Sequence, residues 1–190
     1  MQKKTDNSNI ESKLALRRHF LKTYHTREER PVVLDACQGS GKIWDVLRNE
    51  FDVRYQGADV KPRRVAIKLD SSRLFDVPGW NFDIVDIDTY GEPWKHYEKL
   101  CCTATKAVTV FLTIGMVRVG GGGGSSQYVR RALGVPNETP PCLVSDVQND
   151  MMGQLLWYPL GRLRLIECLE APAGRKARYL GLRLLPVTEK

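Results

Sequence analysis

Residues 31–47 read PVVLDACQGSGKIWDVL, and this stretch decides how the rest of the chain is interpreted. An apolar run is followed by a turn that contains Gly39 and Gly41 and then by an amphipathic segment, an order that predicts a strand, a turn and a helix. In such a unit the backbone N–H groups at the start of the helix can approach a ligand closely. The stretch therefore predicts a ligand-binding turn at one edge of a sheet.

Short apolar runs continue after this stretch and are separated by turn or helix signals. Their alternation with helical segments predicts a mostly parallel α/β sheet with helices on both faces. Residues 162–186 read as two strands joined by a Pro-Ala-Gly turn, which predicts a C-terminal antiparallel hairpin that the plain dinucleotide-binding fold lacks. The expected parallel strands cover residues 32–34, 53–58, 65–69, 82–87 and 107–114.

A chain of 190 residues, 42% of them hydrophobic, is long enough for one sizeable core. The sequence predicts a single domain over residues 31–190, preceded by a basic leader and an amphipathic helix over residues 1–30. Further helices are expected over residues 127–133 and 143–157, and the glycines at 120–124 predict a flexible loop. Because no apolar run is long enough to cross a bilayer and the first residues are polar, we expect a cytoplasmic protein.

The cysteines and histidines show no spacing typical of a metal site. The five cysteines are odd in number and lack a CxxC motif, so we expect reduced thiols and no bound metal. The histidines are scattered, and we expect surface or packing roles for them. The cysteines are Cys37, Cys101, Cys102, Cys142 and Cys168, and the histidines are His19, His25 and His96.

Positive charge exceeds negative charge, with 29 Lys and Arg against 22 Asp and Glu and a formal net charge of +7. The basic residues are dense near both ends of the chain. Because a basic surface attracts polyanions, we expect a nucleic-acid partner, bound in part by Arg17 and Arg18 of the leader helix and by the terminal hairpin. A solvated basic face with no nucleic-acid role is the alternative.

Three classes of ligand compete for the glycine turn. A phosphate-binding GxxxxGK(S/T) loop fails because Ala36 stands at its first glycine and Ile43 at its hydroxyl position. A dinucleotide GxGxxG fingerprint fails because Trp44 stands at the third glycine. Asp35 at the end of the strand is unfavourable beside a phosphate and favourable beside a cationic ligand.

The segment Asp35-Ala-Cys-Gln-Gly39-Ser-Gly41 resembles the first motif of class I S-adenosylmethionine-dependent methyltransferases, whose sheet is Rossmann-like. In that family an acid at the end of the second strand, here Asp59, holds the ribose hydroxyls, and one after the third strand, here Asp70, contacts the adenine amino group. Helix N-caps are the structural alternative for both. The resemblance implies S-adenosylmethionine as cofactor, with contacts from Asp35, Gly39, Gly41, Asp59, Asp70, Ser71 and Asp86.

The segment 81–94, NFDIVDIDTYGEPW, resembles the fourth motif of methyltransferases that act on exocyclic amino groups of bases, and more closely that of the tRNA guanine N2-dimethyltransferase family. The resemblance implies that Asp88 accepts the target amine and that Tyr90 stacks on the base. Thr89 stands where that family has proline, and it and Trp94 are expected to contact the substrate. The alternative is that the acids of this segment cap a strand end and the aromatic residues pack in the next helix.

These observations favour methylation of a base amino group in RNA or DNA, with RNA favoured by the resemblance. Methylation of a small molecule or a protein is a second interpretation, in which the basic ends are incidental. A third is a module that keeps the fold for binding without catalysis, which the threonine in the fourth motif allows.

Overall fold

The computed structural model describes residues 9–25, 30–61, 67–77, 79–89, 92–115, 127–173 and 177–187. Within these ranges seven strands form one sheet in the order β3-β2-β1-β4-β5-β7-β6. The strands are β1 (Val32–Asp35), β2 (Arg54–Asp59), β3 (Ile67–Lys68), β4 (Ile84–Ile87), β5 (Val108–Gly115), β6 (Leu163–Ala171) and β7 (Ala177–Pro186).

Strands β1 to β5 run parallel, and β7 pairs antiparallel with both β5 and β6. This arrangement confirms the predicted mostly parallel sheet with a C-terminal antiparallel hairpin. The chain builds outward from β1 to β3 and then crosses back to place β4 on the other side of β1. The carboxyl ends of β1 and β4 therefore lie at the topological switch point, which is where open α/β sheets bind ligands.

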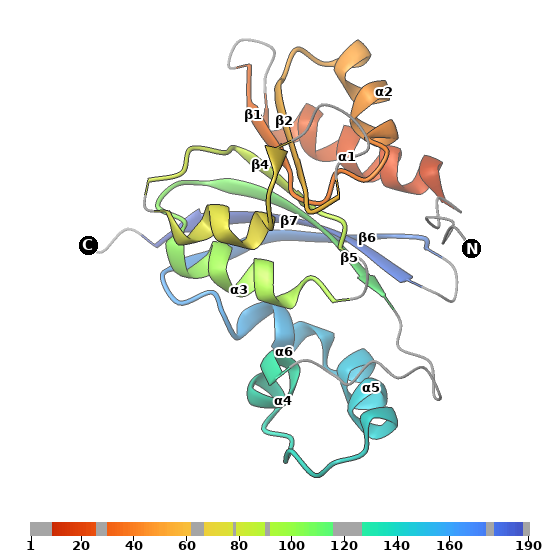
Figure 1. Cartoon of the computed structure of the whole chain (residues 1–190), viewed down its shortest axis with the longest axis vertical. Helices are drawn as coiled ribbons and strands as arrows, with labels where there is room; N and C mark the ends of the chain where they lie inside the picture. Colours follow the sequence, from red (N-terminus) through yellow and green to blue (C-terminus); the bar gives the residue numbers. More distant parts are fainter. Residues whose placement is uncertain are drawn as a thin grey trace.

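Helices cover both faces of the sheet, with α1 and α2 on one side and α3, α4 and α6 on the other (Figure 1). The leader helix ends at Tyr24, before the expected residue 30, and the helix expected over residues 143–157 is two helices that meet at Met151. The helices are α1 (Ile10–Tyr24), α2 (Lys42–Glu50), the 3₁₀ helix η1 (Ser71–Asp76), α3 (Trp94–Thr103), α4 (Gln127–Leu133), α5 (Pro141–Asp150) and α6 (Met152–Trp157).

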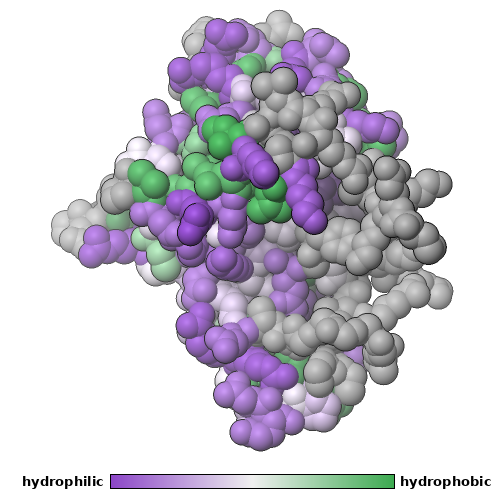
Figure 2. Space-filling view, viewed as in Figure 1, coloured by the Kyte–Doolittle hydropathy of each residue, from purple (hydrophilic) through white to green (hydrophobic). Residues whose placement is uncertain are grey.

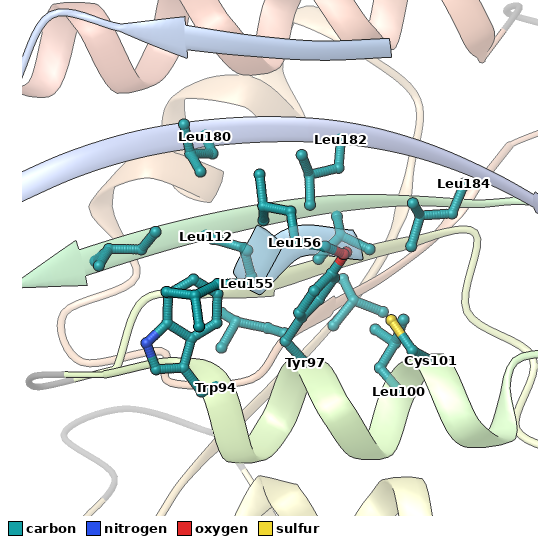
Figure 3. Packing of buried hydrophobic residues seen from close by; sticks show 14 of the residues in the cluster. Trp94, Tyr97, Leu100, Cys101, Leu112, Leu155, Leu156, Leu180, Leu182 and Leu184 are labelled. Atoms are coloured by element: carbon teal, nitrogen blue, oxygen red, sulfur yellow. The ribbon is translucent and has the colours of Figure 1, made fainter. Parts of the chain in front are cut away.

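The sheet separates two hydrophobic cores. On β5, Val110 and Leu112 face α3 and α6, whereas Phe111 between them faces α1. Figure 3 shows Trp94 and Tyr97 of α3 pointing toward the leucines of β5 and β7 in the first of these cores. Because both faces are covered, the central strands are continuous apolar runs, which is why the sequence predicts them well.

The helix α1 is packed tightly onto the sheet by Phe20. A Cβ atom added to Gly181 of β7 would lie 2.4 Å from Phe20 Cε2, so only glycine leaves room for the ring. The same ring meets Phe111 edge to face, with centroids 5.6 Å apart. The basic helix at the start of the chain therefore shares a core with the sheet.

The glycine-rich loop 120–124, Tyr90 and the hairpin turn at 174–176 lie outside the described residues. In the part that is described, no helix has the length and apolar character needed to span a membrane. On the face drawn in Figure 2, hydrophilic side chains dominate the described residues at both ends of the molecule, and hydrophobic ones gather between them.

Candidate functional site

The glycine turn lies at the switch point, directly after β1. Gly39 and Gly41 have φ angles of +53° and +68°, which are left-handed values that favour glycine. The Gly39 N–H donates to Asp59 Oδ2 over 2.9 Å, and the Lys61 N–H donates to Asp59 Oδ1 over 2.7 Å. The structure therefore brings together the turn and the second-strand acid that the sequence predicts to bind the cofactor. Each carboxylate oxygen keeps further acceptor capacity.

The acid after the third strand acts as a cap. Asp70 accepts a hydrogen bond from the Ser72 N–H over 3.0 Å. The side chain of Ser72, and to a smaller extent its backbone N–H, lowers the pKa of Asp70 below its ordinary value. Its carboxylate also lies 3.6 Å from the ammonium group of Lys95. The capping alternative is thus realised in η1, and contact of Asp70 with adenine stays a prediction.

Ser71 pairs with a histidine for which the sequence predicts only a surface or packing role. Its hydroxyl lies 3.0 Å from His96 Nε2 and 4.0 Å from the Cys37 Sγ. Burial lowers the pKa of His96 and raises that of Cys37 to about 12, so the imidazole is neutral and the thiol protonated near pH 7. No motif connects these residues, because they come from the turn after β1, from η1 and from α3.

Two acids lie side by side at the switch point. Asp35 of β1 and Asp86 of β4 are direct partners in the parallel register, and both are buried. Asp35 accepts a hydrogen bond from the Tyr55 hydroxyl over 2.8 Å, and Asp86 accepts one from the Trp44 indole over 2.7 Å. Burial, followed by the charge of Asp86, raises the pKa of Asp35 to about 8.

Arg17 neutralises Asp86 from inside the protein. Its Nε and Nη2 groups donate to the two carboxylate oxygens of Asp86 over 2.7 Å each, and its side chain is 3% exposed. The expectation that Arg17 belongs to a nucleic-acid surface is therefore wrong, because the guanidinium is enclosed and each of its three nitrogens donates a hydrogen bond within the protein. Arg18, on the outer side of α1, does lie near the surface and pairs with Glu50 over 2.6 Å.

Trp94 is also an interior residue. It is fully buried at the start of α3 and stacks on Tyr128 of α4 with ring centroids 5.5 Å apart. The expected contact of Trp94 with substrate is therefore wrong for this conformation, and the packing alternative holds. Its position depends on a helix that lies more than thirty residues later in the chain.

The end of β4 brings Asp88 to the same edge of the sheet. Asp88 Oδ2 lies 2.5 Å from the Lys13 ammonium group, and the carboxylate side chain is 34% exposed. Thr89 follows with its hydroxyl oxygen buried and unbonded to any described residue. Among the described residues, no group of three or more His, Cys, Asp or Glu side chains could hold a metal ion.

No protein-family model matches this chain, and no curated protein matches it. Several solved structures match the fold of this chain. TYW2 from M. jannaschii in complex with AdoMet is 11% identical with a TM-score of 0.61, and the match covers 97% of this chain and 79% of that one. Trm1 from Pyrococcus horikoshii with S-adenosyl-L-methionine is 12% identical with a TM-score of 0.59, covering 97% and 57%.

The chain has a methyltransferase fold. A third match is the plantazolicin methyltransferase BpumL in complex with a triazolic desmethylPZN analog and SAH. It is 12% identical with a TM-score of 0.52, and the match covers 93% of this chain and 84% of that one. At these identities the similarity is one of fold, and the chemistry of this chain has to be argued from its own site.

Proposed function

We propose that this protein is an S-adenosylmethionine-dependent methyltransferase that acts on an exocyclic amino group of an RNA base. The observation that carries the proposal is the bond between the Gly39 N–H and Asp59 at the carboxyl ends of β1 and β2. It joins a left-handed glycine turn and an acceptor carboxylate at the carboxyl edge of a sheet whose fold is similar to that of solved methyltransferases.

The donor and acceptor groups of this edge suit S-adenosylmethionine. When bound, that cofactor supplies an electrophilic methyl group on a sulfonium and carries an ammonium group and no phosphate. Asp59 offers carboxylate oxygens for two ribose hydroxyls, and Asp70 offers an acceptor for the adenine amino group. Asp35, once ionised, would face the ammonium group favourably.

The acceptor for the substrate amine is Asp88. Its Oδ1 atom has no hydrogen-bond partner among the described residues, and the side chain is 34% exposed just past β4. An exocyclic amine is a poor nucleophile because its lone pair is delocalised into the ring. A carboxylate that accepts one of its N–H groups favours the developing tetrahedral nitrogen and aligns it for displacement.

The RNA substrate is supported by the net charge of +7 and by the likeness of the fourth motif to the tRNA guanine N2-dimethyltransferase family. In the leader helix, Arg18 is the arginine that lies near the surface, because Arg17 is enclosed. Tyr90, the proposed stacking residue, follows Asp88 and Thr89 in the same segment.

The test has two arms. Calorimetric titration with S-adenosylmethionine measures cofactor binding, and transfer of a tritiated methyl group to bulk tRNA, rRNA and DNA measures activity. We expect binding, transfer to RNA, and loss of most transfer in Asp88→Ala with cofactor affinity nearly unchanged. If the wild-type protein does not bind the cofactor, the proposal is wrong. Binding without transfer to any nucleic acid would favour a small-molecule or protein substrate, or a non-catalytic role.

A further inference from the structure

A buried lysine reaches the proposed substrate edge from α1. The side chain of Lys13 is 5% exposed, and its ammonium group lies 2.5 Å from Asp88 Oδ2 and 4.7 Å from the centre of the Tyr179 ring. Lysine is rarely buried unless it is paired. The pair therefore joins the first helix of the chain to the residue that follows β4.

The backbone around Lys13 is anchored by its neighbour one turn along. Arg17 donates through Nη1 to the Lys13 carbonyl over 3.0 Å while its other donors hold Asp86. Phe20, on the same side of α1, packs against Gly181 and Phe111. The helix is thus fixed at successive turns, and the ammonium group has little freedom to leave the carboxylate.

The bond to Lys13 makes the two oxygens of Asp88 inequivalent. Oδ2 faces the buried ammonium group, whereas Oδ1 has no partner among the described residues. A carboxylate rotates readily about its Cβ–Cγ bond because that torsion is broad. Because Lys13 fixes Oδ2, it also fixes the direction in which Oδ1 can accept a hydrogen bond.

We infer that Lys13 is a positioning residue for methyl transfer, which holds Asp88 so that Oδ1 accepts an N–H of the target amine. The inference rests on the proposed function. In this interpretation α1 supports the active site, because its buried cations bond to the acids of β4 and of the segment after it.

The experiment compares Lys13→Met, which keeps the length of the stem and removes the charge, with Lys13→Arg, which keeps a donor. Lys106→Met is the matched control, because it removes the same kind of ion pair, here with Asp83, at the amino ends of β4 and β5 and away from the proposed site. Asp88→Asn and the double variant Lys13→Met/Asp88→Asn complete a cycle. For each protein, single-turnover transfer to bulk RNA, the dissociation constant of S-adenosylmethionine and the thermal unfolding midpoint are measured.

We expect Lys13→Met to slow transfer at least about tenfold with cofactor affinity within about twofold, and Lys13→Arg to recover most of the rate. The double variant should be no slower than Asp88→Asn alone, because Lys13 acts through that carboxylate. A folded Lys13→Met protein with an unchanged or faster rate would overturn the inference, and so would a double variant slowed by the full product of the two single effects.

If Lys13→Met does not fold, the same cycle is measured with Lys13→Gln, and the same outcomes decide. A wild-type protein that binds no cofactor, or binds it and transfers nothing, removes the proposed function and this role with it.

Discussion

Asp35 and Asp86 are direct neighbours across β1 and β4, and the guanidinium of Arg17 is bonded to Asp86. Two adjacent buried carboxylates repel each other when both are charged. The two acids avoid this repulsion because only Asp86 is paired with a cation. Burial and the charge of Asp86 raise the pKa of Asp35 to about 8. Near neutral pH, Asp35 is therefore mostly protonated.

Cofactor affinity should rise with pH. Because an ammonium group favours the ionised form of Asp35, binding at pH values below 8 requires loss of a proton. The binding constant of S-adenosylmethionine should therefore increase roughly tenfold between pH 6 and pH 7. Calorimetry in two buffers of different ionisation enthalpy would detect the released proton directly.

Asp35→Asn is the control for this dependence. Because the amide cannot ionise, the variant should bind S-adenosylmethionine more weakly than the wild-type protein, and its affinity should change little between pH 6 and pH 7. Measurements belong below about pH 7.5, because the α-amino group of the ligand itself titrates near pH 8. Equal affinity of the wild-type protein at pH 6 and pH 7, with no proton released, would mean that Asp35 does not meet the ammonium group.

The two neighbouring arginines of α1 should differ sharply in their effect on stability. Arg17→Met leaves Asp86 buried without its cation, and we expect a loss of about 3–5 kcal/mol in the free energy of unfolding. Arg18→Met removes an ion pair near the surface and should leave the urea midpoint almost unchanged. Methionine is nearly as good a helix former as arginine, so the comparison isolates the ion pairs. Equal urea midpoints for the two variants would contradict the conclusion that Arg17 is enclosed and neutralises Asp86.

The strands could be predicted from the sequence because burial on both faces makes them apolar runs. The strand expected over residues 107–114 is found at Val108–Gly115, and the terminal hairpin lies where its turn signal places it. The glycine turn and Asp59 could be predicted as well, since a turn after β1 and an acid ending the adjacent β2 reach the same edge of a parallel sheet.

The role of α1 could not be predicted in this way. Lys13 and Arg17 read as solvent-facing charges, and the carboxylates that hold them are 75 and 69 residues away in the chain. Helical periodicity does not distinguish a cation in water from a cation bonded to a buried acid. The pairing of Ser71 with His96 is hidden for the same reason, because it forms only when η1 and α3 pack together.

Asp59→Ala should weaken S-adenosylmethionine binding by about 1–3 kcal/mol, which is roughly 5- to 150-fold in the dissociation constant. The variant removes the proposed acceptor of the ribose hydroxyls and also the partner of the Gly39 N–H. Asp52→Ala is the control, because Asp52 is exposed, precedes β2 and pairs with Arg30. Titration calorimetry gives both constants, and an Asp59→Ala protein that binds as tightly as the Asp52→Ala protein would remove Asp59 from the cofactor site.

Gly181→Ala should displace α1 from the sheet. The added Cβ would lie 2.4 Å from Phe20 Cε2 and 3.0 Å from Cδ2, distances at which the ring has to move. Overpacking of this kind costs about 1–3 kcal/mol, which urea unfolding would measure. Gly153→Ala in α6 is the control, because nothing lies within 4 Å of the added atom and alanine is the better helix former.

A second substitution separates the clash from other effects of the alanine. Phe20→Leu removes the colliding edge of the ring, so Gly181→Ala/Phe20→Leu should be more stable than the sum of the two single losses predicts. Because Phe20 and Lys13 lie on the same packed helix, Gly181→Ala alone should also slow methyl transfer by moving the ammonium group away from Asp88. Full additivity of the two unfolding energies would show that the ring does not press on β7, and the close packing of α1 would then fail as the reason for the glycine.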